Sequence, residues 1–209
     1  MKLVRSSIAI LVVVSCSAAA LAGDAETYIA GQTFANNNCT WCHGPSGQGY
    51  TVAPRLAGQR RQYIENQLSN FFSHARDNPL SQQYMWGVRG APMILSPETV
   101  RDLARYFSSL HAEAANDGDR RLAAEGQAIY RDGSPASNIP SCVACHGPNA
   151  EGIREFPRLG GLSYYYLKRR LNQWGEGYHA AALRPMPGVA SKMSEREIEA
   201  VASYLSFVK

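Results

Sequence analysis

The apolar residues of this 209-residue chain recur at helical spacing, and no stretch alternates polar and apolar residues as a β-strand does. The clearest helix face lies near the C-terminus and consists of Ile198, Val201, Ala202 and Leu205, at positions i, i+3, i+4 and i+7. Ser194 and Glu197 have the spacing of a capping box, which satisfies free N–H groups at the start of this helix. Ser96, with Pro97 at the first helical position, marks the start of an earlier helix. The pattern therefore predicts an all-α protein.

The helical pattern occurs twice. Residues 24–36 and 119–131 are each predicted to form a helix, and a middle helix follows in each half. Four positions of the middle helices match at an offset of 103 residues: Tyr63, Ile64, Leu68 and Phe71 correspond to Tyr166, Leu167, Leu171 and Trp174. We therefore predict an internal duplication, with domains at residues 23–112 and 119–209 and a polar linker at residues 113–118.

Both copies carry the same chemical motif. The first contains Cys39-Thr40-Trp41-Cys42-His43, and the second contains Cys142-Val143-Ala144-Cys145-His146. Cys-x-x-Cys-His is the attachment signature of c-type haem, in which two thiols form thioethers with one porphyrin and the histidine supplies an axial nitrogen to iron. A zinc site would usually bring a second cysteine pair within about 20 residues, and a thioredoxin-type dithiol needs a βαβ context. The sequence therefore predicts two covalently attached haem c groups.

The N-terminus has the pattern of a secretory signal peptide. Basic residues precede an apolar run at residues 8–14, and Ala20-Leu21-Ala22 offers a cleavage site between small residues. The run is too short to span a bilayer, which takes about 20 residues. We expect residues 1–22 to be removed and the protein to be exported to the periplasm, with a lipid anchor at Cys16 as the alternative.

Charge and cysteine content narrow the possible functions. The net charge of +4 falls to +2 without residues 1–22, and neither copy has a large excess of basic residues. Nucleic acid is therefore not an expected partner. Beyond residue 22, all four cysteines belong to the haem motifs, so none is left for a disulfide or for a thiolate ligand to iron.

The duplicated plan closely resembles the dihaem cytochrome c4 family. Besides the haem motifs, the resemblance covers Pro54-Arg55-Leu56-Ala57-Gly58 and Pro157-Arg158-Leu159-Gly160-Gly161, and the endings Ala104-Arg105-Tyr106-Phe107 and Ala202-Ser203-Tyr204-Leu205. It implies two tandem class-I-like cytochrome c domains, each wrapping one haem, with the haems facing each other across a domain interface. It also implies that a histidine and a methionine ligate each iron. The sequence departs from the family in the first domain, where the loop before the last helix is longer.

Met186 is the candidate methionine ligand of the second domain. It lies between two prolines, on a predicted loop just before the last helix, where the prolines would stiffen the chain. Met193 adjoins the helix cap and fits a core position better. The rival imidazole ligands lie in polar sequence and are expected at the surface: His74, His111 and His179.

Met85 is the candidate ligand of the first domain, in preference to Met93. Met85 follows His43 by 42 residues and Met93 follows it by 50, whereas Met186 follows His146 by 40. The sequence Met85-Trp86-Gly87-Val88 also repeats the frame of Met186-Pro187-Gly188-Val189. An insertion of three residues at positions 89–92 accounts for the longer loop. We therefore assign His43 and Met85 to one iron and His146 and Met186 to the other.

Residues next to these ligands have two interpretations each. Pro54 and Pro157 could offer a carbonyl to the ring N–H of the iron-bound histidine, a contact that the resemblance supports. Arg55 and Arg158 are either solvated at the surface or held beside a haem propionate. Trp41, between the two cysteines of the first motif, is expected to pack. Tyr166 is expected in the core, with Tyr164 and Tyr165 at the surface or a domain interface.

The predicted function is one-electron transfer, with a bc1-type complex or a dehydrogenase as donor and a terminal oxidase as acceptor. An electron carrier is thus expected rather than an enzyme. The alternatives are a cytochrome subunit of a larger oxidoreductase that oxidises sulfide or thiosulfate, or a dihaem peroxidase. A peroxidase needs an open or weakly ligated iron, whereas both halves offer a methionine. Membrane association is expected only through partners or through a lipidated Cys16.

Overall fold

The computed structural model describes residues 23, 25–50, 53–87, 95–178 and 185–209. The predicted signal peptide at residues 1–22, with Cys16, lies outside this part of the chain. The described residues form helices and turns, with a single isolated bridge between Ser134 and Ile139. The all-α expectation is therefore confirmed. None of the helices in these ranges is both long and apolar enough to cross a membrane.

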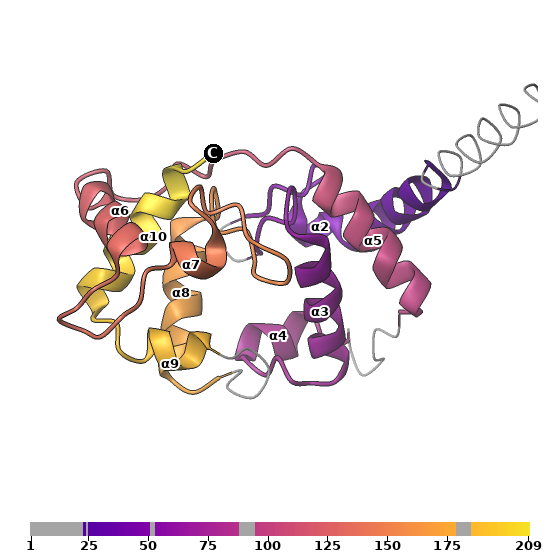
Figure 1. Cartoon of the computed structure of the whole chain (residues 1–209). Helices are drawn as coiled ribbons and strands as arrows, with labels where there is room; N and C mark the ends of the chain where they lie inside the picture. The colour runs from indigo at the N-terminus through magenta and orange to yellow at the C-terminus, as the bar shows by residue number, and fades with distance from the viewer. Residues whose placement is uncertain (1–22, 24, 51–52, 88–94, 179–184) are drawn as a thin grey trace, which may run out of the picture.

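The helices fall into two halves that lie side by side (Figure 1). The first half contains a helix at residues 25–38, α2 (Thr40–His43), α3 (Arg61–Phe72), α4 (Pro79–Tyr84) and α5 (Pro97–Ser109). The second half repeats this order with α6 (Ala123–Asp132), α7 (Val143–His146), α8 (Tyr164–Gly175), α9 (Met186–Ala190) and α10 (Glu195–Phe207). The order of elements is thus duplicated as predicted.

The helix starts follow the local chemistry of the sequence. The Ser96 side chain accepts a hydrogen bond from the Thr99 N–H at 3.1 Å, and Ser194 and Glu197 form the complete capping box of α10. The predicted helix at 119–131 begins only at Ala123. The Asp119 carboxylate accepts from the Arg121 N–H at 2.9 Å, which favours a turn over the first residues of that range.

A glycine allows the first and last helices to cross in each half. A Cβ on Gly31 would lie 2.2 Å from the carbonyl oxygen of Asp102 in α5, and one on Gly126 would lie 1.9 Å from that of Ala200 in α10. No side chain fits in this space, so the backbones approach closely only because these residues are glycine. The crossing brings the stripe of α10 against α6 and α8.

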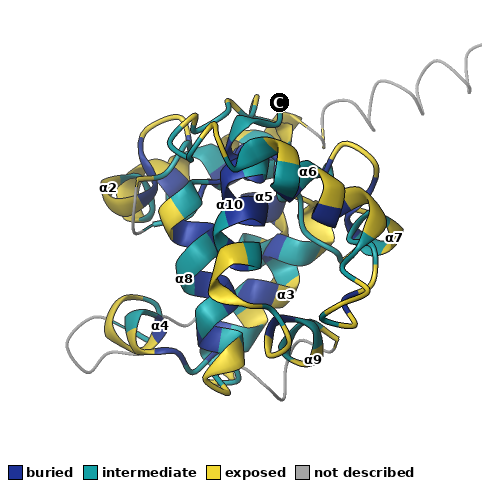
Figure 2. Ribbon diagram, turned by 90° about the vertical axis from the view of Figure 1, so that its left-hand side faces the viewer, coloured by how far each residue is buried: buried dark blue, intermediate teal, exposed yellow. Residues whose placement is uncertain are grey.

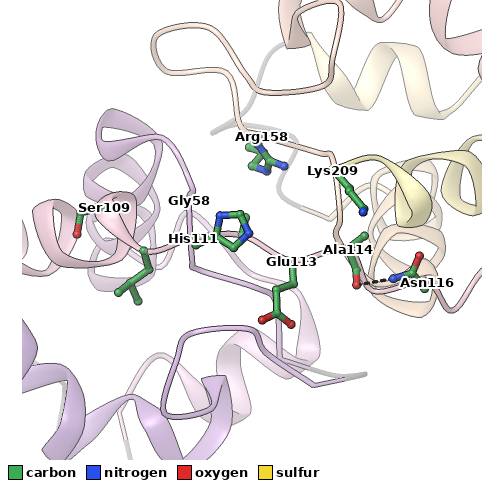
Figure 3. Close-up of a pocket in the computed structure, with 10 residues that line it drawn as sticks. Gly58, Ser109, His111, Glu113, Ala114, Asn116, Arg158 and Lys209 are labelled. Carbon is green, nitrogen blue, oxygen red and sulfur yellow. Dashed lines mark hydrogen bonds between the residues drawn. The ribbon is translucent and has the colours of Figure 1, made fainter.

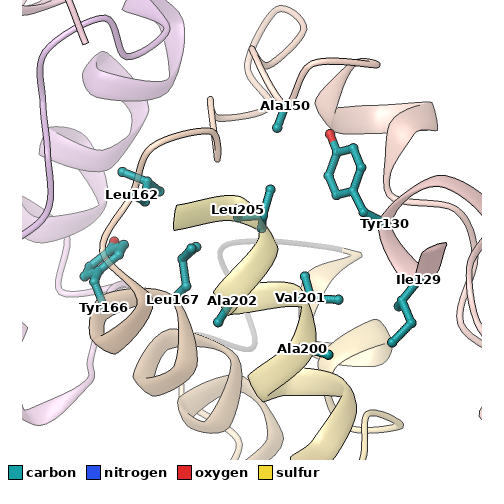
Figure 4. Packing of buried hydrophobic residues seen from close by; sticks show 10 residues of the cluster. All are labelled: Ile129, Tyr130, Ala150, Leu162, Tyr166, Leu167, Ala200, Val201, Ala202 and Leu205. Carbon is teal, nitrogen blue, oxygen red and sulfur yellow. The ribbon is translucent and has the colours of Figure 1, made fainter. Parts of the chain in front are cut away.

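Each half has an apolar core beneath this crossing. The core of the second half joins the inner faces of α6, α8 and α10 and includes Tyr130, Tyr166, Leu167, Val201 and Leu205 (Figure 4). The core of the first half is built mainly from α5, joined by Ala35 of the helix at 25–38 and Ile64 of α3. Figure 2 shows buried residues on the inward faces of α5, α8 and α10, whereas α2 is largely exposed. Tyr166 is buried, as predicted.

The linker is held to both halves by hydrogen bonds. Asp117 accepts from the Ser163 hydroxyl at 2.7 Å and from the Tyr164 N–H at 2.8 Å, so its carboxylate lies at the start of α8. Gln48 of the first half bonds to the main chain at His111, just before the linker, and at Glu113, its first residue. A groove of about 720 Å³ lies beside the linker (Figure 3). It is lined by side chains of both charges, so it favours neither cations nor anions.

Candidate haem-binding sites

The two haem motifs each form a single helical turn that presents free thiols. The His43 N–H bonds to the Cys39 carbonyl at 2.9 Å, and the His146 N–H bonds to the Cys142 carbonyl at the same distance. None of the four cysteines in the described residues forms a disulfide. Burial raises the pKa of Cys39 and of Cys142 to about 11, so both thiols are neutral at physiological pH.

Each motif histidine is buried and held by a proline carbonyl. The Nδ1 atom of His43 lies 2.8 Å from the Pro54 oxygen, and the Nδ1 atom of His146 lies 3.0 Å from the Pro157 oxygen. Because a carbonyl only accepts, Nδ1 must donate, and Nε2 keeps its lone pair for a metal. Burial lowers the pKa of both imidazoles below the usual value, which favours this neutral form. The geometry is the one expected for an iron ligand with a fixed ring.

The candidate methionines occupy corresponding places in the two halves. Met85 is half-buried at the C-terminal end of α4, where its N–H bonds to the Ser81 carbonyl at 2.8 Å. Met186 is half-buried against the cluster of Leu171, Ala190 and Ile198 and is the first residue of α9, so the expectation that it lies on a loop is wrong. Pro187 explains the difference, since proline favours the first turn of a helix.

The remaining candidates are placed as follows. Met193 packs against the apolar clusters of the second half, as expected of a core residue. His74 and His111 are exposed, and His74 stacks on the Trp86 ring with centroids 4.1 Å apart. Met93 and His179 lie outside the described residues. Which methionine ligates the first iron therefore stays a prediction.

Trp41 does not pack. Its side chain is 84% exposed, so the expectation of a packing role is wrong. The reason is the geometry of the single turn α2, in which His43 faces the interior and a residue two positions earlier points to the opposite side. Tyr165 is likewise exposed, as predicted.

The two repeated arginines bond to main chain at the junction of the halves. The Arg55 guanidinium donates from Nη1 to the carbonyls of Glu113 and Gly161, and Arg158 donates from Nε to the Gly160 carbonyl at 3.0 Å. Arg55 is thus not a solvated surface residue. Its contact with a propionate stays a prediction.

Arg76 is a junction residue that the sequence did not indicate. Its guanidinium is 7% exposed and donates to the Gln67 amide oxygen at 2.8 Å and, across the junction, to the Tyr166 hydroxyl at 3.2 Å. The one sequence feature that pointed to this part of the fold was the repeated tyrosine, Tyr63 and Tyr166. Both of these side chains hydrogen-bond to the Arg76 guanidinium. Arg76 itself lies in an irregular segment without a periodic pattern.

These residues fit two haem c groups. Each half offers two free thiols one turn apart and a neutral imidazole with Nε2 available. Four buried donors also lack a partner among the described residues: Arg55 Nε, Gln67 Nε2, Arg76 Nε and Trp174 Nε1. Buried donors need acceptors, and haem propionates are carboxylates that would supply them. Two such donor sets in one helical chain define a dihaem c-type cytochrome.

Comparison with known proteins agrees with this class. A family model described as Cytochrome c matches residues 28–111 and 123–209. Cytochrome c4 of Thiocapsa roseopersicina is 32% identical over a match covering 90% of this chain and 95% of that protein. The solved structure of cytochrome c4 from Acidithiobacillus ferrooxidans superposes with a TM-score of 0.73 at 33% identity, covering 81% of this chain and 98% of that chain.

The chain belongs to the cytochrome c family, and its duplicated plan is that of the dihaem cytochromes c4. The expected fold of two tandem cytochrome c domains is therefore confirmed. Two covalently bound haem c groups follow from the two domains.

Proposed function

We propose that this protein is a periplasmic carrier that takes single electrons from a membrane or periplasmic donor and passes them to a terminal oxidase. The bound haem supplies iron that gains and loses one electron. The observation that supports the proposal is that each half brings two motif cysteines together with a buried histidine whose Nδ1 is held by a proline carbonyl. Relatives named thiosulfate dehydrogenase electron acceptor, from Thiomonas intermedia and Stutzerimonas stutzeri, are 35% and 36% identical and support a carrier role.

The motif residues have distinct roles in this proposal. The four cysteines attach the two haems through thioethers: Cys39 and Cys42 in the first domain, and Cys142 and Cys145 in the second. His43 and His146 bind iron through Nε2, while Pro54 and Pro157 hold the rings at Nδ1. Met85 and Met186 would each supply a thioether ligand to one iron, which would leave neither iron open to oxygen or peroxide. Thioether ligation also favours a high reduction potential.

Charged residues at the junction serve the propionates. Within the described part of the chain, Arg55 and Arg76 are buried cations whose Nε has no partner, and the indole N–H of Trp174 has none either. An unpaired buried charge is strongly unfavourable, so bound carboxylates stabilise this arrangement. Arg158 is the corresponding residue of the second copy and is proposed to contact a propionate as well. The propionates would thereby tie haem binding to the contact between the domains.

Mass spectrometry and carbon monoxide binding test the proposal. The mature mass should exceed the polypeptide by two haems that acid–acetone does not extract, and a chain that starts near Gly23 would exclude lipidation at Cys16. The reduced protein should show low-spin spectra and should not bind carbon monoxide appreciably at neutral pH. One haem per chain, or rapid binding of carbon monoxide to half the haem, would contradict a simple carrier.

The second candidate is a cytochrome subunit of a larger oxidoreductase. The solved structure of a thiosulfate dehydrogenase (TsdBA) from Marichromatium purpuratum matches 86% of this chain at 29% identity with a TM-score of 0.71. This chain covers 40% of that one, so a similar unit occurs there within a longer protein. Size-exclusion chromatography of a native extract distinguishes the candidates, because a carrier elutes alone and a subunit elutes with its partner.

A further inference from the structure

Gln59 joins the first half of the molecule to the main chain that supports the second histidine. Its side chain is 4% exposed. Its amide Nε2 donates to the Arg158 carbonyl at 2.9 Å, and its Oε1 accepts from the Arg158 N–H at 2.7 Å. One side-chain amide therefore pairs with both main-chain groups of Arg158 across the junction.

The bonded N–H group lies in the same peptide unit as the carbonyl that holds His146. The Arg158 nitrogen is joined to the Pro157 carbonyl carbon, and the Pro157 oxygen accepts from His146 Nδ1 at 3.0 Å. A continuous chain of hydrogen bonds thus runs from Gln59 through one peptide group to the imidazole. Hydrogen bonds in such chains polarise one another, so the bond at the N–H end makes Pro157 a stronger acceptor.

In the ranges that the structure describes, the first half does not receive the same contact from the second. Its own peptide unit, Pro54–Arg55, holds His43 in the same way. The residue of the second copy that corresponds to Gln59 is Leu162, which is 5% exposed and packs in the core of the second half. A leucine side chain has no group to pair with a peptide. The two copies therefore differ at this position, and only Gln59 bonds to a peptide group that holds a motif histidine.

We propose that Gln59 is a positioning residue through which the first domain lowers the reduction potential of the second haem. The inference rests on the proposed role of His146 as an iron ligand. A stronger acceptor at Nδ1 raises the basicity of the imidazole, and a more basic ligand stabilises ferric iron relative to ferrous iron. The second potential then depends on whether the two domains are in contact at Gln59.

Redox titration of the Gln59→Leu holoprotein, followed optically, tests the inference. Leucine is the residue that the second copy carries at this position. The reduction equilibrium constant of the second haem should rise about threefold to tenfold, which is about 30 to 60 mV at 59 mV per tenfold change. The potential of the first haem should stay the same. The Met85→Ala and Met186→Ala variants assign the two steps, because each lowers the potential of its own haem strongly.

Gln48→Leu is the matched control. Gln48 makes the same kind of paired contact. Its Nε2 donates to the His111 carbonyl at 2.7 Å, and its Oε1 accepts from the Glu113 N–H at 3.1 Å. Those peptide groups belong to the end of the first domain and the start of the linker, and not to the segment that holds His146. The control should therefore leave the second potential unchanged. Gln59→Met, which keeps the length of the side chain, replaces Gln59→Leu if leucine prevents folding.

Three results would overturn the inference. They are an unchanged second potential in a folded Gln59 variant, an equal shift of both potentials, and the same shift in Gln48→Leu. The spectrum of the unaltered protein separates this failure from failure of the proposed function. A low-spin, six-coordinate spectrum keeps the ligand assignment even where Gln59 has no effect, whereas a high-spin spectrum removes the assignment itself.

Discussion

Each motif histidine has its Nδ1 atom committed to a proline carbonyl, at 2.8 Å for His43 and 3.0 Å for His146. Burial favours the neutral ring in both cases, because it lowers the imidazole pKa. The proline hydrogen bond thus fixes the tautomer and the orientation of each ring, whether or not a methionine binds the same iron. Met85 is predicted to supply the sulfur that completes the first site, and substitution tests this assignment.

Met85→Ala should remove about half of the near-infrared sulfur-to-iron band and strongly lower one potential, because the first iron would lose its thioether ligand. Met93→Ala should leave the band and both potentials intact and cost some stability only. Absorption of the oxidised protein and redox titration measure both effects. The opposite pattern would assign the ligand to Met93.

The proximal side of each site could be predicted from the sequence, whereas several single residues could not. The Cys-x-x-Cys-His motif and the proline eleven residues later are local patterns whose spacing repeats. The exposure of Trp41 was missed because the motif constrains its cysteines and histidine but not the residues between them. Arg76 was missed because an isolated arginine in irregular sequence gives no indication of burial.

At the scale of helices, the close crossing of the first and last helix shapes each half. Gly31 and Gly126 make this crossing possible, and the side-chain caps at Ser96 and Ser194 and the apolar stripes fix the helix boundaries. These features depend on residues close together in sequence, which explains why the pattern predicted the helices well. Met186 is the exception, since a loop and a five-residue helix have similar sequence signals around prolines.

Gly126→Ala should destabilise the protein by about 1–3 kcal/mol or more. The added Cβ would lie 1.9 Å from the Ala200 carbonyl oxygen, so α6 and α10 would have to separate. Gly175→Ala is the control, because the nearest atom to its Cβ is 4.0 Å away. Denaturant unfolding of the holoproteins measures the difference. Equal stability of the two variants would contradict the close crossing.

Glu197 should make the start of α10 sensitive to acid. Burial alone would raise the pKa of this carboxyl, but hydrogen bonds from Ser134, Ser194 and Ser137 lower it to about 2. The unfolded group titrates near 4.5, so its stabilising effect is present above that pH and is lost as the pH falls toward 2. Glu197→Gln should therefore reduce stability at neutral pH and weaken its decline between pH 4.5 and 2. Thermal unfolding at a series of pH values measures this, and parallel pH profiles would contradict it.

At the scale of the whole molecule, the junction makes two similar domains unequal. Gln59 and Arg76 reach from the first half to the second, and Arg55 bonds to both the linker and the second half. Sequence patterns could not predict these contacts, because such patterns are local and Gln59 and Arg158 are separated by 99 residues. The internal repeat predicts the features that the two domains share. The contacts between the domains depend instead on positions where the two copies differ.

Tyr166→Phe should weaken the junction. The variant removes the hydroxyl that accepts from Arg76 at 3.2 Å and leaves a buried cation with one partner fewer, at a cost of about 1–3 kcal/mol. Tyr165→Phe is the control, since Tyr165 is 54% exposed, and its effect should be within about 0.5 kcal/mol. Urea unfolding compares the two variants. A Tyr165 effect as large as that of Tyr166 would show that the hydroxyl contact does not stabilise the junction.

The most direct test of a dihaem electron carrier is an optical redox titration of the purified protein. Two covalently held haems with both axial positions filled should take up two electrons per chain in reversible steps, with low-spin c-type spectra throughout. A total of one electron per chain, or a high-spin signal from one of the haems, would contradict the account.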